Sequence, residues 1–186
     1  MGEITKEKLN GIDTEALKQV MGQISKDPSV GKLKFQVTTT WKGTTKSETV
    51  VQGYEIGGQR VKRLHTFVID EPTELLGEDT AANPQEYLMG AMNACIINTY
   101  VIAAAMKGIR LDKVEMETEG ELDLRGFLGM DKNVITGYKE LKYKVRLKGS
   151  GTREQYEEVH RTVVATSPNY YNMTHAIKLN TELVLE

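Results

Sequence analysis

The chain has 186 residues, of which 27% are charged and 39% hydrophobic, a composition that is typical of a globular domain and excludes a disordered chain. The formal net charge of −2 leaves no electrostatic footprint for binding nucleic acid or an anionic membrane. A single cysteine excludes a disulfide within the chain, and because the N-terminus lacks a signal-peptide pattern we expect a reducing cytoplasm.

The first part of the chain, residues 1–30, is expected to form a helical extension. Apolar residues recur at helical spacing within residues 4–26, and Asp13 or Thr14 is suited to cap the helix. An Asp-Pro-Ser sequence at 27–29 is expected to end it.

The remainder, residues 31–186, is expected to form one domain that begins with three strands. Apolar and polar residues alternate over 33–41, which is typical of a strand with one buried face. A return strand is expected over 47–52 and a third strand over 61–70, with a turn at the glycine pair 57–58.

A stretch of twenty residues without a charge, 87–106, predicts a long helix. Asn83 is suited to cap it, Pro84 to occupy its first position, and a Lys-Gly pair at 107–108 to end it. The length would cross a bilayer. Small and polar residues within the stretch instead favour a helix buried inside the protein, and these residues include Gly90, Ala91, Asn93, Ala94, Asn98 and Thr99.

Two later segments read as strands with charged faces of opposite sign. Residues 114–124 alternate apolar residues with Glu and Asp, and residues 141–148 alternate apolar residues with Lys and Arg. Opposite charges favour antiparallel pairing, so we expect a hairpin, or two near neighbours, around a connection over 125–138.

The last third predicts a helix and a final strand. Thr152 and Gln155 have the spacing of a capping box for a helix through about Thr166. A Ser-Pro pair at 167–168 is expected to stop this helix, and alternation over 177–185 predicts the last strand. Helices and strands in this order predict an α+β fold.

No metal or other cofactor is expected. His65, His160 and His175 are far apart in the sequence and do not have the spacing of metal ligands. Tyr170 and Tyr171 follow the Ser-Pro pair and fit either a pocket wall or an ordinary packed turn.

The run of residues 83–88, Asn-Pro-Gln-Glu-Tyr-Leu, precedes Ala94 and Cys95 on one uncharged helix. This arrangement resembles the signature of the OsmC family, which comprises osmotically inducible protein C and the organic hydroperoxide resistance proteins. A Gly-Phe-Leu-Gly run at 126–129 and the later Ser-Pro pair are similar to the family's second half.

The resemblance covers about residues 33–186 and implies a fold and an assembly. The implied fold has two antiparallel β-sheet halves around a long buried helix. The implied assembly is an intertwined homodimer with both sites at the subunit interface. The small residues at 90, 91 and 94 would let a partner helix approach closely.

The family reduces organic hydroperoxides with a pair of cysteines, and the resemblance implies that Cys95 is the peroxide-attacking one. Ser167 stands where the second cysteine is expected, and Gln85 stands where an acidic partner is expected. The position of the family's essential arginine stays open, and the candidate cations are Lys42, Lys46, Arg60 and Arg63.

Two functions are compatible with these differences from the family's pattern. In the first, an OsmC-like protein has lost two-cysteine peroxidase chemistry and holds an apolar small molecule in an interface pocket, beside Met89, Met92, Ile96 and Ile97. In the alternative, a one-cysteine reductase uses Cys95 on organic hydroperoxides and draws on an external thiol reductant.

Overall fold

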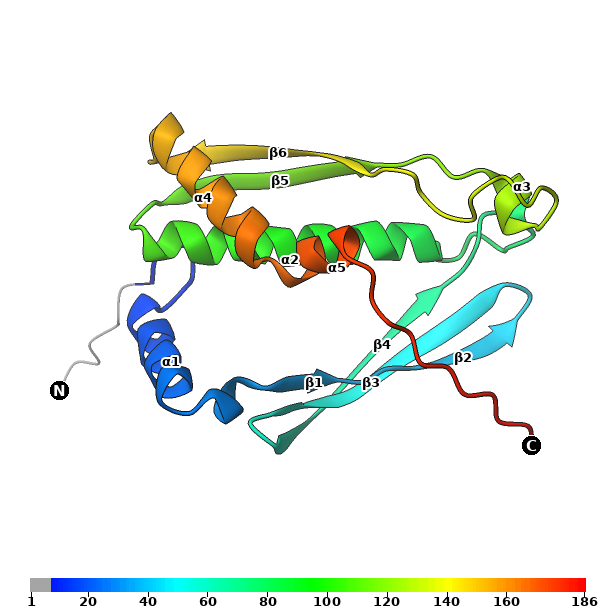
Figure 1. Cartoon of the computed structure of the whole chain (residues 1–186), viewed down its shortest axis with the longest axis horizontal. Coiled ribbons are helices and arrows are strands. Elements are labelled where there is room, and N and C mark those ends of the chain that lie inside the picture. Colours follow the sequence, from blue (N-terminus) through cyan, green and yellow to red (C-terminus); the bar gives the residue numbers. More distant parts are fainter. Residues whose placement is uncertain (1–7) are drawn as a thin grey trace. The chain divides into compact units, whose positions relative to one another are not determined.

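The computed structural model describes residues 8–186, and the described residues divide into two compact units (Figure 1). One unit ends at Gly90 and the other is Ala91–Glu186. The predicted division into a 1–30 extension and a 31–186 domain stays a prediction, and residues 1–7 lie outside the described part.

The N-terminal helix α1 is Thr14–Lys26, and the carboxylate of Asp13 caps its first turn as predicted. The helical region expected from residue 4 is wrong for the described residues before the cap. Asn10 and Gly11 have positive φ angles of 54° and 79°, which a right-handed helix does not accept. They form a tight turn instead.

Within residues 8–90, four antiparallel strands form one sheet in which β3 pairs with each of the others. The segment expected as a single strand over 33–41 is interrupted, and its two parts both lie along β3. Gly57 and Gly58 have φ angles of 55° and 77°, as a tight hairpin turn requires. The short helix before the sheet is η1 (Pro28–Gly31), and the strands are β1 (Leu33–Phe35), β2 (Thr38–Gly43), β3 (Lys46–Ile56) and β4 (Gln59–Ile69).

Asp70 follows β4 and fixes the loop that leads to the long helix. Its side chain is 0% exposed. Its carboxylate accepts hydrogen bonds from the hydroxyl of Thr45, the N–H of Glu71, and both the N–H and hydroxyl of Thr80, at 2.8–3.1 Å. The loop, which contains the short helix η2 (Thr73–Leu75), is therefore tied to the sheet through one buried carboxylate.

We expect this carboxylate to make stability depend on pH. Desolvation acts to raise the pKa of Asp70, but the hydrogen bonds from Thr80, Glu71 and Thr45 outweigh it and hold the pKa well below 3.8. Because the folded pKa is depressed, the contribution to stability is full above about pH 4 and is lost as pH falls toward the folded pKa. Asp70→Asn should lower the melting temperature at pH 7 and flatten its decline below pH 4.

Thermal unfolding followed by circular dichroism at pH 7, 4 and 2 measures both effects. Glu74→Gln, which neutralises an exposed carboxylate in the same loop, should behave like wild type. An Asp70→Asn variant with the wild-type pH profile would contradict the role of the carboxylate.

The long helix α2 is Pro84–Met106, as predicted. The side-chain oxygen of Asn83 accepts the N–H of Glu86 at 2.9 Å, and the carboxylate of Glu86 accepts the N–H of Asn83 at 2.8 Å, which completes a capping box. Gly108, with φ of 71°, follows its last turn.

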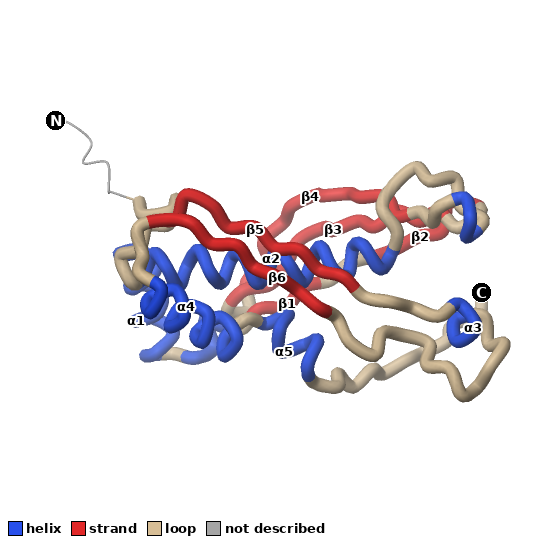
Figure 2. Tube along the Cα trace, turned by 90° about the horizontal axis from the view of Figure 1, so that it is seen from above, coloured by secondary structure: helices blue, strands red, loops and turns tan. Residues whose placement is uncertain are grey.

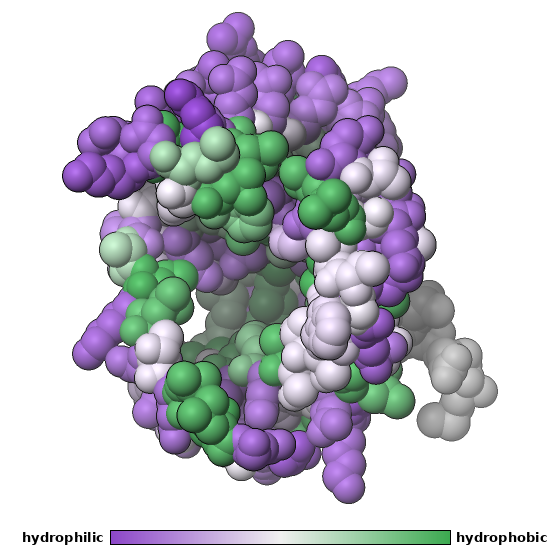
Figure 3. All heavy atoms as spheres, turned by 90° about the vertical axis from the view of Figure 1, so that its right-hand side faces the viewer, coloured by the Kyte–Doolittle hydropathy of each residue, from purple (hydrophilic) through white to green (hydrophobic). Residues whose placement is uncertain are grey.

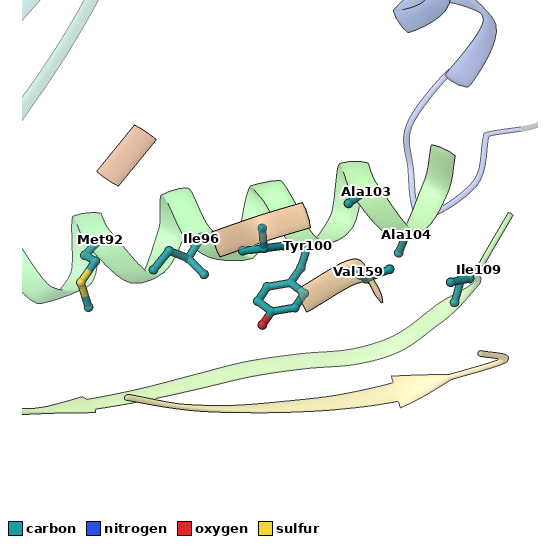
Figure 4. Close-up of a cluster of buried hydrophobic side chains, with 8 residues drawn as sticks. Met92, Ile96, Tyr100, Ala103, Ala104, Ile109 and Val159 are labelled. Carbon is teal, nitrogen blue, oxygen red and sulfur yellow. The ribbon is translucent and has the colours of Figure 1, made fainter. Parts of the chain in front are cut away.

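Of the described helices, α2 alone is long and apolar enough to cross a membrane, by length and composition. A third of its most apolar 18-residue window, 33%, is buried inside the chain. The buried residues include Met92, Ile96 and Tyr100, which belong to the core cluster in Figure 4.

Within residues 91–186, β5 (Leu111–Glu119) and β6 (Lys142–Gly149) form an antiparallel pair beside α2 (Figure 2). The predicted charge pairing is confirmed, since Glu115 lies opposite Arg146 and Glu117 lies opposite Lys144. Arg146 also forms ion pairs with both glutamates, at 3.1 and 2.8 Å.

The helix α4 is Arg153–Thr166, and the predicted capping box between Thr152 and Gln155 is present. Two short α-helices of this unit were not predicted. The helix α3 (Leu124–Phe127) occupies the end of the segment expected as a strand, and α5 (Pro168–Thr174) occupies the turn expected after the Ser-Pro pair. The fold class is confirmed as α+β, with an antiparallel sheet in each unit and a long helix.

The predicted last strand is wrong for the single chain, because residues 177–185 have no regular structure. A segment of alternating apolar and polar residues forms a strand only where a neighbouring strand forms hydrogen bonds with the backbone of the segment. The apolar side chains of this segment are exposed, with Leu179 at 82% and Leu183 at 84%.

Candidate functional site

Cys95 lies on α2 within the second unit and is half-buried. Its Sγ lies 3.8 Å from the Oγ of Ser167, which is 2% exposed. The structure therefore brings together two of the three residues singled out from the sequence, although they are 72 positions apart in the chain.

Ser167 is held at this position by the break between two helices. Its N–H donates to the carbonyl of Val163 at 2.9 Å and ends α4, and Pro168 begins α5. Proline disfavours helical geometry in the residue before it, so Ser167 is extended, with φ of −73° and ψ of 119°.

The hydroxyl of Ser167 does not cap α5, so it is available to the sulfur. Either group can be the donor in this contact. Ser167 can therefore hydrogen-bond Cys95, but it cannot form a disulfide with it.

Gln85 lies in the first turn of α2 and belongs to the unit that ends at Gly90. Cys95 lies ten positions further along the helix, which corresponds to about 15 Å along a helix axis. The role expected for Gln85 stays a prediction.

Three of the four candidate cations have partners within their own unit. Lys42 pairs with Glu48 at 3.1 Å, and Lys46 pairs with Glu78 at 2.6 Å. The guanidinium of Arg63 lies 5.0 Å from the centre of the Tyr54 ring. The cation that would activate Cys95 stays open.

Sequence reasoning missed a polar pair in the second unit. The hydroxyl of Tyr100, a residue that is 1% exposed on α2, is hydrogen-bonded to Nδ1 of His160 on α4. Burial, with a further contribution from Tyr143, raises the pKa of Tyr100 to about 12, so the phenol keeps its proton. A single sequence carries no signal of this pair, because the two residues are 60 positions apart in the chain.

Apolar packing holds α4 in place. Val159 and Val163 of α4 are buried in the same cluster as Ile96 and Tyr100 of α2, as Figure 4 shows for the labelled residues. The positions of Ser167 and His160 therefore depend on a close-packed core, whose side chains have little room to shift.

Among residues 8–186, no group of three or more His, Cys, Asp or Glu side chains is placed to hold a metal ion.

The comparisons with known proteins identify the family. A family model described as OsmC-like protein matches residues 77–182, a span that contains both Cys95 and Ser167. The uncharacterized protein YmaD of Bacillus subtilis (strain 168) is 31% identical over 120 residues, which cover 63% of this chain and 75% of that protein.

Solved structures show the same fold. An OsmC-like protein from Mycoplasma pneumoniae matches with a TM-score of 0.60 and 14% identity, over 76% of this chain and 87% of that chain. An OsmC-like protein from Vibrio cholerae matches with a TM-score of 0.52 and 14% identity, over 74% of this chain and 91% of that chain. The family model, which covers more than half of the sequence, shows that this chain belongs to the OsmC family.

Proposed function

We propose that this protein is a one-cysteine, thiol-dependent organic hydroperoxide reductase in which Cys95 is the reactive group. The observation that carries the proposal is the 3.8 Å contact between Sγ of Cys95 and Oγ of Ser167. Cys95 is half-buried, and its sulfur has the buried hydroxyl of Ser167 as a hydrogen-bond partner.

The reaction needs two stages. The Cys95 thiolate attacks the outer oxygen of the hydroperoxide and the O–O bond breaks. The sulfur becomes a sulfenic acid, and the alkoxide takes a proton and leaves as an alcohol.

An external thiol then attacks the sulfenic sulfur, a mixed disulfide forms and water leaves. A second external thiol attacks the mixed disulfide, which restores the Cys95 thiol and releases a disulfide of the two external thiols. We propose a cytoplasmic location, where thiols are kept reduced.

Turnover of cumene hydroperoxide with dithiothreitol tests the proposal. Wild type should turn over slowly, since each cycle waits for a thiol from solution, and Cys95→Ser should fall to the rate without protein. Peroxide without thiol should add one oxygen to the wild-type mass and none to that of Cys95→Ser. Wild-type turnover that survives in Cys95→Ser would contradict the assignment.

The second candidate is a binding module that holds an apolar small molecule beside Cys95 without turnover. Glutamine at position 85 and serine at position 167 favour it, because both lack the chemistry of the family's two-cysteine site. An inactive wild type whose Cys95 also resists alkylation by iodoacetamide would support this candidate over the reductase.

We also propose that the protein is a homodimer that uses an exposed stripe on α2. The stripe consists of Ala91, Ala94, Asn98 and Ile102, which recur at helical spacing and are exposed in the single chain. Hydrophobic side chains also lie on the outer surface in Figure 3. Exposed large apolar residues elsewhere include Phe35, Trp41, Leu179 and Leu183. A partner would cover surface that a single soluble chain rarely exposes.

A further inference from the structure

A groove of about 970 Å³ lies in the second unit, on residues that the proposed reductase does not use. It is lined from α2, β6 and α4, and pockets of about 300–1,000 Å³ are the usual size for small ligands. Its apolar part includes Val145, Leu147 and the side chains of Tyr143 and Tyr156.

The groove also presents the imidazole of His160, whose Nδ1 is hydrogen-bonded to the hydroxyl of Tyr100. When Tyr100 is the donor in this bond, the neutral ring carries its proton on Nε2. His160 lines the groove and is exposed, and it offers this N–H to a ligand acceptor.

Two arginines of α4 line the same groove and differ in their ion-pair partners. Arg153 is paired with Glu157 at 3.0 Å. The carboxylate of Glu158 is hydrogen-bonded to Lys107, which lowers its pKa, and the positive charge of Arg161 lowers it further without a hydrogen bond. The parallel N–H groups of the Arg161 guanidinium are therefore available to donate to a planar anion such as a carboxylate.

We propose that this groove is a binding site for a small aromatic carboxylate. Arg161 and Nε2 of His160 hold the carboxylate. The ring lies against Tyr143 and Tyr156, since aromatic rings favour stacked or edge-to-face contacts. The site does not use Cys95, so it can be tested separately from the reductase.

Titration of ¹⁵N-labelled protein with phenylacetate, followed by amide chemical shifts, tests the site. We expect saturable shifts in α4 and β6 with a Kd of about 1 mM or tighter. Arg161→Gln should weaken binding at least tenfold, and so should replacing the probe with uncharged phenylacetamide. Cys95→Ser should bind phenylacetate as wild type does.

Lys144→Gln is the matched control, because it removes one cation from an exposed position of β6 outside the groove lining. It should leave the affinity unchanged. No saturable shift up to 10 mM, equal affinity in Arg161→Gln, or an equal loss in Lys144→Gln would each overturn the proposal. Hexanoate binding as tightly as phenylacetate would overturn the aromatic specificity.

Discussion

Ser167→Cys is expected to form a disulfide with Cys95 after peroxide treatment and to raise dithiol-dependent turnover of cumene hydroperoxide by about tenfold or more. The two side chains already approach to 3.8 Å, and a disulfide needs Cα atoms within about 7 Å. The sulfenic acid at Cys95 would then meet a thiol of the same chain instead of waiting for one from solution.

The disulfide is measured by intact mass under non-reducing conditions, and turnover is measured with dithiothreitol as the final reductant. Ser150→Cys supplies a matched control, because it adds a second thiol at an exposed position of the same unit, where Ser150 contacts Arg110 after the last turn of α2. It should form no disulfide with Cys95 and leave turnover unchanged. If Ser167→Cys behaves like this control, the contact does not reproduce a two-cysteine site.

A third variant separates the role of the acidic position from that of the second thiol. Combining Ser167→Cys with Gln85→Glu should raise turnover further only if a cation is available near Cys95 for the new carboxylate to orient. An unchanged rate in this double variant would leave Gln85 as a helix-surface residue and would not affect the Cys95–Ser167 result.

The parts of the fold that the sequence predicted are those set by local chemistry. The capping box of Thr152 and Gln155 and the proline at position 84 mark helix starts without reference to distant residues. The opposite charges of β5 and β6 also indicated a pairing that the register confirms.

The parts that were missed depend on tertiary contacts. The alternation over 177–185 is that of a strand, but no strand within residues 8–186 pairs with the segment. The short helix α5 was missed because a proline that ends one helix can also begin the next. Proline is well suited to the first turn of a helix, and Pro168 begins α5.

In the candidate site, too, sequence motifs indicated some residues, and tertiary contacts revealed the others. Cys95 and Ser167 were found through a resemblance between motifs, and the structure adds their contact. The pair of Tyr100 and His160 joins residues 60 positions apart, and single tyrosine and histidine residues carry no signal of such a contact in one sequence. The groove they help to line could be identified only after α4 was placed against α2.

Wild-type protein is expected to have the mass of two chains in light scattering at micromolar concentration, and Ala94→Glu the mass of one. Ala94 lies within the exposed stripe of α2, and a glutamate there would be buried without a partner in a helix-to-helix interface, which is costly. Ala165→Glu makes the same substitution at an exposed position of α4 and should remain a dimer. A single-chain mass for wild type would rule out the dimer. A dimeric Ala94→Glu would rule out the stripe on α2 as its interface.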